Sequence, residues 1–165
     1  MGTQGTRASR ADLEQLYRNH LPELLRVAAA ICRDREAAPD VVHDGFVRAL
    51  RELASFRGTG PLAGWLWRIV VNTARNHRRD NPAHEPLPFE PVANGNGSSE
   101  EGRVAAAVSL LPERQRLVLF LRFYADLDYA SIGEALGITT GTVGATLAAA
   151  RAALEQHLSE KEATG

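Results

Sequence analysis

Apolar residues recur at intervals of three and four along most of the chain, which is the spacing of one face of an α-helix. Near the C-terminus, Val143 and Leu147 begin such a stripe. In front of it, Asp128 is a favourable N-cap and Gly137 can take the left-handed conformation that ends a helix. Two short helices around a glycine-containing turn are typical of the helix-turn-helix motif, whose second helix enters the DNA major groove. An ordinary helical hairpin in a small bundle is the alternative.

The N-terminal half shows the same helical spacing. Ser9 and Asp12 predict a capping box at the start of a first helix, and Pro22 predicts a kink or two consecutive helices. A second helix is expected over 40–53 and a third over 62–79. Because no stretch of useful length alternates as a strand would, the fold class is predicted to be all-α.

A change of composition divides the chain. Residues 81–102 are rich in Pro, Gly and Glu and poor in apolar side chains, which is typical of a disordered or extended linker. The sequence therefore predicts two small helical domains, 1–81 and 103–165, joined by a flexible acidic linker over 82–102.

Charge is distributed unevenly along the chain, although the net charge is only −1. Residues 1–82 carry 13 Arg against 9 Asp and Glu, whereas residues 83–102 carry four Glu and no basic residue. From Leu53 to Arg79 there are five Arg and no acid. This asymmetry favours a surface for a polyanion in the first half.

The third predicted helix concentrates this charge on one face. Polar and basic side chains recur there at steps of three and four: Arg68, Asn72, Arg75, Asn76 and Arg79. Most charged faces are only solvated surface, but the absence of acids favours nucleic acid here. Arg and Asn suit phosphate contacts and hydrogen bonds to base edges, and neighbouring aromatics suit stacking on unpaired bases.

Other classes of protein are less favoured. There is no apolar run long enough to span a membrane and no apolar core of a signal peptide, which favours a cytoplasmic protein. Cys32 is expected to be a small buried hydrophobe. An enzyme is least expected, because no nucleophile, metal-ligand cluster or phosphate loop accompanies His43 and Asp44. No cofactor and no metal are predicted.

Five motifs in order resemble the extracytoplasmic-function (ECF) group of the sigma-70 family of RNA polymerase sigma factors. They are 40–50 (DVVHDGFVRAL), 56–58 (FRG), 65–76 (WLWRIVVNTARN), 111–116 (LPERQR) and 141–143 (GTV). Each is moderately specific alone, but their order, their spacing and the linker between them make the combination specific. The resemblance covers about 12–158.

The resemblance implies a bacterial protein in which the two domains bridge RNA polymerase and promoter DNA. The helix over 40–53 would dock on the clamp helices of the polymerase core through Asp40, His43, Asp44 and Arg48. Recognition and melting of the −10 element would fall to Arg57, Thr59, Arg68, Asn72, Arg75, Asn76 and Arg79. The second domain would bind the polymerase flap, and its recognition helix would bind the −35 element as duplex. Many relatives are held by an anti-sigma factor, which adds such a protein to the candidate partners.

The recognition helix departs from the family pattern. After the Gly-Thr-Val, family members often carry Lys or Arg, then Ser-Arg and then another Arg, where this chain has Gly144, Ala145-Thr146 and Ala149. Only Arg151 is basic between Tyr129 and Leu154. A bidentate Arg contact provides about 1–3 kcal/mol of base discrimination, so that contribution is nearly absent. The remaining candidates for −35 contact are Thr139, Thr140, Thr142, Thr146 and Arg151.

Two alternatives to a sigma factor stay open at this point. A free-standing helix-turn-helix regulator would share the C-terminal motif, but it needs no Trp-rich basic helix for melting DNA. A polymerase-binding interaction protein with weakened −35 recognition would fit the arginine-poor recognition helix.

Overall fold

The computed structural model describes residues 7–58, 60–82, 100–123 and 125–164. Every regular element within these ranges is a helix, which confirms the all-α prediction. The elements are α1 (Arg10–Cys32), α2 (Ala38–Glu52), the 3₁₀ helix η1 (Leu53–Ser55), α3 (Leu62–Asp80), α4 (Glu100–Ser109), α5 (Glu113–Phe123), α6 (Tyr129–Leu136) and α7 (Thr140–Ala163).

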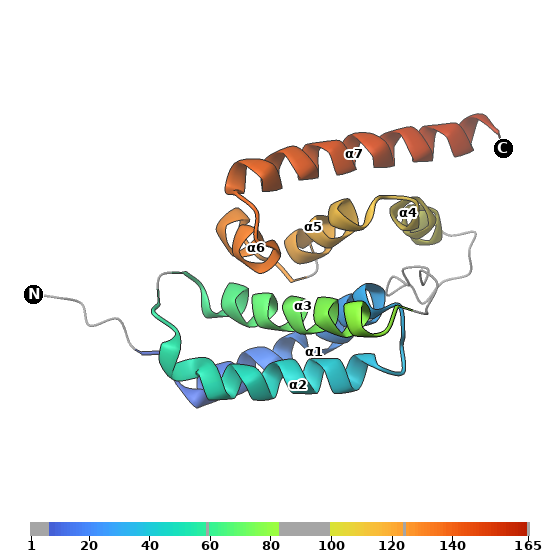
Figure 1. Cartoon of the computed structure of the whole chain (residues 1–165). Coiled ribbons are helices and arrows are strands. Elements are labelled where there is room, and N and C mark those ends of the chain that lie inside the picture. The colour runs from blue at the N-terminus through green and yellow to red at the C-terminus, as the bar shows by residue number, and fades with distance from the viewer. Residues whose placement is uncertain (1–6, 59, 83–99, 124, 165) are drawn as a thin grey trace, which may run out of the picture.

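Helices α1, α2 and α3 form the N-terminal bundle (Figure 1). The predicted capping box is confirmed, with the Ser9 hydroxyl accepting from the Asp12 amide and the Asp12 carboxylate accepting from the Ser9 amide. The alternative of two helices around Pro22 is wrong, because α1 continues through this residue. A proline inside a helix removes one hydrogen bond, and the buried face of α1, which includes Leu24 and Ile31, holds the helix together beyond it.

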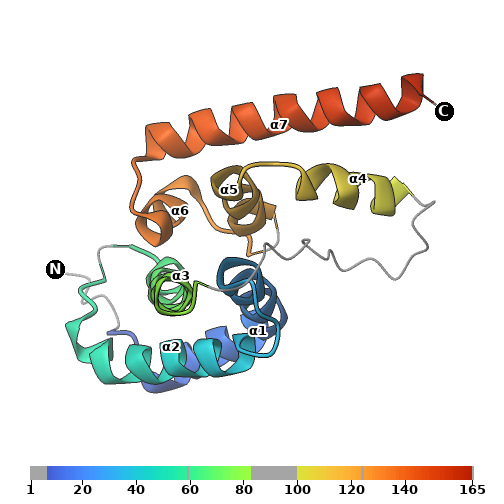
Figure 2. The same cartoon turned by 45° about the vertical axis from the view of Figure 1, so that its right-hand side comes forward.

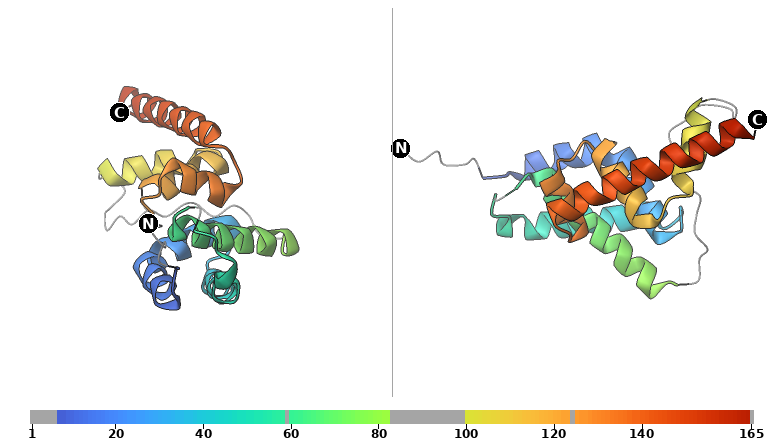
Figure 3. Two further views of the ribbon diagram at one scale, coloured as in Figure 1. Left: turned by 90° about the vertical axis from the view of Figure 1, so that its left-hand side faces the viewer. Right: turned by 90° about the horizontal axis from the view of Figure 1, so that it is seen from above.

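The C-terminal helices α4 to α7 form the second layer of the molecule (Figures 2 and 3). As predicted, Asp128 caps α6 and Gly137 ends it with a φ of 68°. Thr139 is the residue that caps α7. Helix α4 begins at Glu100, so the last three residues of the predicted linker are helical; residues 83–99 lie outside the described part of the chain.

The apolar stripe that begins at Val143 and Leu147 continues along α7 to Leu158, and only its first part is buried. Val143, Leu147 and Ala150 are shielded from solvent, whereas Leu154 and Leu158 are half-buried. The C-terminal half of α7 runs alongside α4 (Figure 1), where Arg103 Nη2 donates to Glu162 Oε1 at 3.3 Å.

The two helical domains pack against each other through α3 and α6, which the sequence does not predict (Figures 1 and 2). Gly64 on α3 lies directly against Ser131 on α6: a Cβ at Gly64 would stand 2.7 Å from the Ser131 Cβ. At the other end of α3, Arg78 Nη1 donates to both carboxylate oxygens of Glu113 on α5, each at 2.8 Å. One continuous apolar core therefore includes residues of both domains.

Candidate nucleic-acid interface

The basic face of α3 is exposed along its whole length. Its buried residues, among them Leu66 and Val70, face α1 and α2, while the candidates for −10 contact lie on the opposite surface. The exposed residues are Arg68, Asn72, Arg75, Asn76 and Arg79. Helical spacing places them on one side, so that they can follow a nucleic-acid backbone together.

The loop before α3 forms a hollow together with the start of α1. Phe56, Arg57 and Gly58 contribute to its wall, together with Asp12 from the start of α1, and its volume is about 950 Å³. The Phe56 ring packs at 5.3 Å from the Trp65 ring, measured between centroids. The Asp12 carboxylate is held by the Ser9 amide and hydroxyl, and these hydrogen bonds lower its pKa. Thr59, a further candidate, lies outside the described residues.

The candidate residues for polymerase contact lie on the outer side of α2. Asp40, His43, Asp44 and Arg48 are all exposed, and α2 lies on the side of the N-terminal bundle that faces away from the C-terminal layer (Figure 2). Arg48 Nε forms an ion pair with Glu52 at 3.1 Å, one helical turn further on. The face is therefore mixed in charge and open to a second protein.

Three of the threonine candidates on α7 are engaged within their own helix. The Thr139 hydroxyl accepts from the Thr142 amide at 3.1 Å and lies 2.9 Å from the Thr142 hydroxyl. The Thr146 hydroxyl donates to the Thr142 carbonyl at 2.7 Å. Thr140 is exposed and forms no side-chain hydrogen bond with any described residue. This leaves Thr140 as the threonine whose hydroxyl is most available to a base edge.

Arg151, the remaining −35 candidate, is held by an aromatic ring. Its guanidinium carbon lies 5.7 Å from the centroid of the Phe123 ring on α5, and Phe123 is itself exposed. A guanidinium over an aromatic face is attracted by the ring electrons. This contact orients the Arg151 side chain toward Phe123 on α5.

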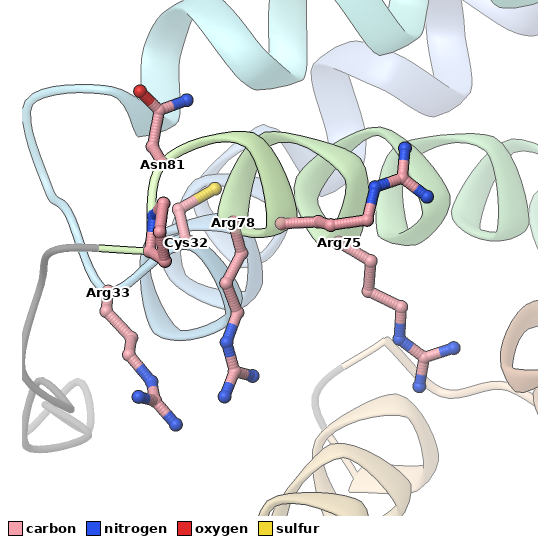
Figure 4. Close-up of a pocket in the computed structure, with 7 residues that line it drawn as sticks. Cys32, Arg33, Arg75, Arg78 and Asn81 are labelled. Carbon is pink, nitrogen blue, oxygen red and sulfur yellow. The ribbon is translucent and has the colours of Figure 1, made fainter.

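Sequence reasoning missed a cluster of arginines where α1 and α3 end. Arg33, Arg75, Arg78 and Arg79 line one hollow, with Cys32 at its wall (Figure 4). Arg75 and Arg79 were expected on a basic face, but Arg33 belongs to another helix and only the fold brings it beside them. Burial, followed by the negative charge of Asp34, raises the pKa of the Cys32 thiol to about 11, and the thiol donates weakly to the Ala74 carbonyl at 3.7 Å.

Other kinds of site are not seen among the described residues. No group of three or more His, Cys, Asp and Glu side chains there is arranged to hold a metal ion. Nor does any described helix combine the length and apolar character needed to cross a bilayer.

A helical protein with a helix-turn-helix, a helix with an exposed basic face and a separate mixed-charge surface belongs to the class of DNA-binding transcription proteins. Comparison with known families agrees: residues 16–83 match sigma-70 region 2, and residues 101–154 match sigma-70 region 4. The chain belongs to the sigma-70 family, in its ECF group.

Individual relatives give the same result. The ECF RNA polymerase sigma factor SigM of Mycobacterium tuberculosis is 34% identical over 149 residues, which cover 88% of this chain and 76% of SigM. RNA polymerase sigma factor YlaC of Bacillus subtilis is 29% identical over 166 residues, covering 92% of this chain and 94% of YlaC.

Two solved structures share the fold. CnrH in complex with the cytosolic domain of CnrY has a TM-score of 0.65 at 23% identity, covering 93% of this chain and 91% of the matched chain. The sigma factor RpoE in complex with the anti-sigma factor NepR, from Bartonella quintana, has a TM-score of 0.68 at 22% identity, covering 90% and 97%.

Proposed function

We propose that this sigma factor directs RNA polymerase to its promoters mainly through the N-terminal domain. The observation that carries the proposal is the exposed basic face of α3, which has five polar or basic side chains and no acid between Leu53 and Arg79. Such a face can hold backbone phosphates against competing salt and present Asn72 and Asn76 to unpaired bases.

The loop in front of α3 supplies a place for an extruded base. Phe56 can stack on it, and Arg57 and backbone groups can form hydrogen bonds to it. Stacking a base on an aromatic ring contributes about 1–3 kcal/mol, which offsets the cost of removing the base from the duplex. The proposal therefore assigns melting of the −10 element to α3 and this loop.

Binding to the polymerase core is assigned to α2 through Asp40, His43, Asp44 and Arg48. These side chains are exposed, and Arg48 pairs with Glu52 on its own helix, so the surface can meet a protein of complementary charge. The −35 element is assigned to Thr139, Thr140, Thr142, Thr146 and Arg151 at the start of α7. Three of these hydroxyls are already bonded within α7, which supports a weak or shape-based contact at this element.

The proposal makes the protein a binding factor rather than an enzyme, acting in the bacterial cytoplasm with core polymerase and promoter DNA. An anti-sigma factor is a candidate partner, since RpoE, which shares the fold, was solved in complex with the anti-sigma factor NepR. The alternative of a free-standing helix-turn-helix regulator has no use for the α2 surface or for the basic face of α3.

Run-off transcription with purified core polymerase tests the proposed function directly. The full chain should produce promoter-dependent transcripts that core polymerase alone does not produce. A free-standing regulator, or a protein that only occupies polymerase, would leave core polymerase without specific transcripts.

Variants then test the division of labour between the domains. Asn72→Ala and Arg75→Ala should reduce transcription more than Arg151→Ala, because base-edge hydrogen bonds and phosphate contacts are concentrated on α3. The first two should also lose permanganate reactivity of unpaired thymines near the −10 element. Arg10→Ala is the matched control, because Arg10 is an exposed arginine that pairs with Glu14 on its own helix. Abolished transcription in Arg151→Ala, with both α3 variants near wild type, would overturn this division.

A further inference from the structure

The hollow at the shared end of α1 and α3 has the composition of an anion-binding site. It is lined by Cys32, Arg33, Arg75, Arg78, Arg79, Asn81 and Pro82, and its volume is about 450 Å³. Four guanidinium groups come from two helices that are far apart in sequence. Figure 4 shows the Arg33 and Arg78 side chains pointing in the same direction from the two helix ends.

The positive charge in this hollow is only partly compensated. Arg33 and Arg75 form no ion pair with any described residue, and Arg79 has only a long, exposed contact of 3.7 Å with Asp80. Cations at helix C-termini are favourable by themselves, because they complement the helix dipole. That effect does not require Arg at position 33, where φ is 59° and Gly or Asn would be the less strained choice.

Arg78 links the hollow to the contact between the domains. Its Nη1 donates to both oxygens of Glu113, the first residue of α5, while the same side chain lines the hollow. Both side chains are partly exposed, at 31% and 38%, so the pair is accessible to a competing anion. A phosphate offers Arg a geometry equivalent to that of the carboxylate.

The contact between the domains also has unpaired polar groups, which a permanent interface tends to avoid. Trp67 Nε1 on α3 and Glu23 Oε2 on α1 are buried without a hydrogen-bond partner among the described residues. Both residues line the same small gap against Phe120 of α5. Water reaches such groups when two surfaces separate, so the missing hydrogen bonds favour a contact that opens.

We propose that the hollow formed by Arg33, Arg75, Arg78 and Arg79 binds a ligand with several phosphate groups, and that the bound phosphate replaces Glu113 on Arg78. Phosphate binding and separation of α5 and α6 from the N-terminal bundle are then coupled. The phosphates can come from the DNA backbone, in which case the inference rests on the proposed function, or from a free polyphosphate. Both sources present the same chemistry to the four arginines.

Tryptophan fluorescence of the full chain tests the proposal, because Trp67 is fully buried at the domain contact. The Trp65→Phe variant leaves Trp67 as the single tryptophan. Tripolyphosphate should shift its emission to longer wavelength and make it more accessible to acrylamide. Sodium chloride at matched ionic strength should have a smaller effect, because it screens the Arg78–Glu113 pair without occupying the hollow.

Two variants in the Trp65→Phe background test the two halves of the proposal. Arg33→Asn keeps a residue that tolerates the left-handed conformation and should weaken tripolyphosphate binding about tenfold, the loss expected for one charge-assisted contact. Glu113→Gln should strengthen binding and expose Trp67 before any ligand is added. Equal tripolyphosphate affinity in the Trp65→Phe parent and in its Arg33→Asn variant would overturn the site. Binding that leaves Trp67 protected would overturn the coupling.

Two further arms identify the source of the phosphate and separate the inference from the proposed function. A short non-promoter duplex that displaces tripolyphosphate assigns the site to the DNA backbone, and a duplex that does not displace it assigns the site to a free polyphosphate. Run-off transcription is measured in parallel with the wild-type chain, because Trp65 packs on Phe56 of the loop assigned to the extruded base. Specific transcription with no response of Trp67 to either ligand overturns the inference alone, and a Trp67 response without transcription overturns the proposed function alone.

Discussion

At the scale of single residues, Cys32 shows how burial changes chemistry. The side chain is 1% exposed and its thiol pKa is raised to about 11 from an ordinary 9.0. In the unfolded chain the thiol ionises near 9.0, whereas in the folded chain it stays protonated to about 11. The unfolded state therefore loses its proton first, and folding stability should fall as the pH rises between these two values.

Urea unfolding at several pH values across this range measures the effect, with Cys32→Ala as the comparison. The variant should be less stable overall, because a buried sulfur is replaced by a smaller group. It should also lose less stability as the pH rises. Tyr17, whose pKa is also raised by burial, is present in both proteins and cancels in the difference. Parallel pH profiles for the two proteins would contradict the prediction.

The sequence predicts the conformation of single residues where the cause lies within the same helical turn. The capping box at Ser9, the cap at Asp128 and the left-handed Gly137 all follow from residues within one helical turn. Arg33 gives no such signal, since nothing around it predicts either its positive φ or its place beside the arginines of α3.

At the scale of elements, the start of α7 combines a structural role with a candidate DNA contact. Thr139 caps the helix, whereas the neighbouring Thr140 makes no cap. Thr139→Ala should cost about 1 kcal/mol of stability, and Thr139→Asp should restore most of it. Thr140→Ala is the matched control and should change the urea midpoint little. An equal loss from both alanine variants would contradict the assignment of the cap.

The α2 surface makes a separate prediction about polymerase binding. Asp44 forms no ion pair with any described residue, whereas Arg48 pairs with Glu52, so reversing Asp44 disturbs the helix least. Asp44→Lys should weaken binding to core polymerase through lost charge complementarity while leaving the melting temperature nearly unchanged. Interferometry measures the affinity, and Glu155→Lys on exposed α7 is a matched charge reversal away from α2. Equal affinities for the two variants would argue against docking through α2.

Helix α3 shows where sequence periodicity reaches its limit. Leu66, Ile69 and Val70 recur at steps of three and four residues along or beside one stripe, and they are buried. Trp67 and Val71 are also fully buried, although they lie off that stripe. Periodicity identifies the face that packs within one domain, but the contact with the C-terminal helices depends on pairs that are distant in sequence.

At the scale of the whole molecule, two residue pairs that are distant in sequence hold the domains together, one at each end of α3. Gly64 allows close approach of α6, and Arg78 bonds to Glu113 on α5. Neither pair carries a sequence signal, because a glycine within a helix and a single exposed Arg also occur in many helices that make no contact with a second domain. The family resemblance predicted the two domains and their candidate surfaces, but not this closed arrangement.

Gly64 gives the sharpest test of that arrangement. In Gly64→Ala the new Cβ would meet the Ser131 Cβ at 2.7 Å and its Cα at 3.0 Å, so α6 has to move away. Alanine is also the better helix former, by about 1 kcal/mol, so α3 itself should not be weakened. We expect a larger radius of gyration in small-angle X-ray scattering and greater access of acrylamide to Trp67, with helicity by circular dichroism retained.

Gly144→Ala is the control for this variant, because its Cβ would make only an ordinary contact of 3.6 Å with the Tyr129 ring. It should leave the radius of gyration unchanged. Gly64→Ala and Glu113→Gln open the same contact by different means, one steric and one electrostatic. If opening is what frees Arg78 for a phosphate, both variants should bind tripolyphosphate more tightly than wild type. An opened Gly64→Ala protein with wild-type affinity would show that Arg78 is not limited by its pairing with Glu113.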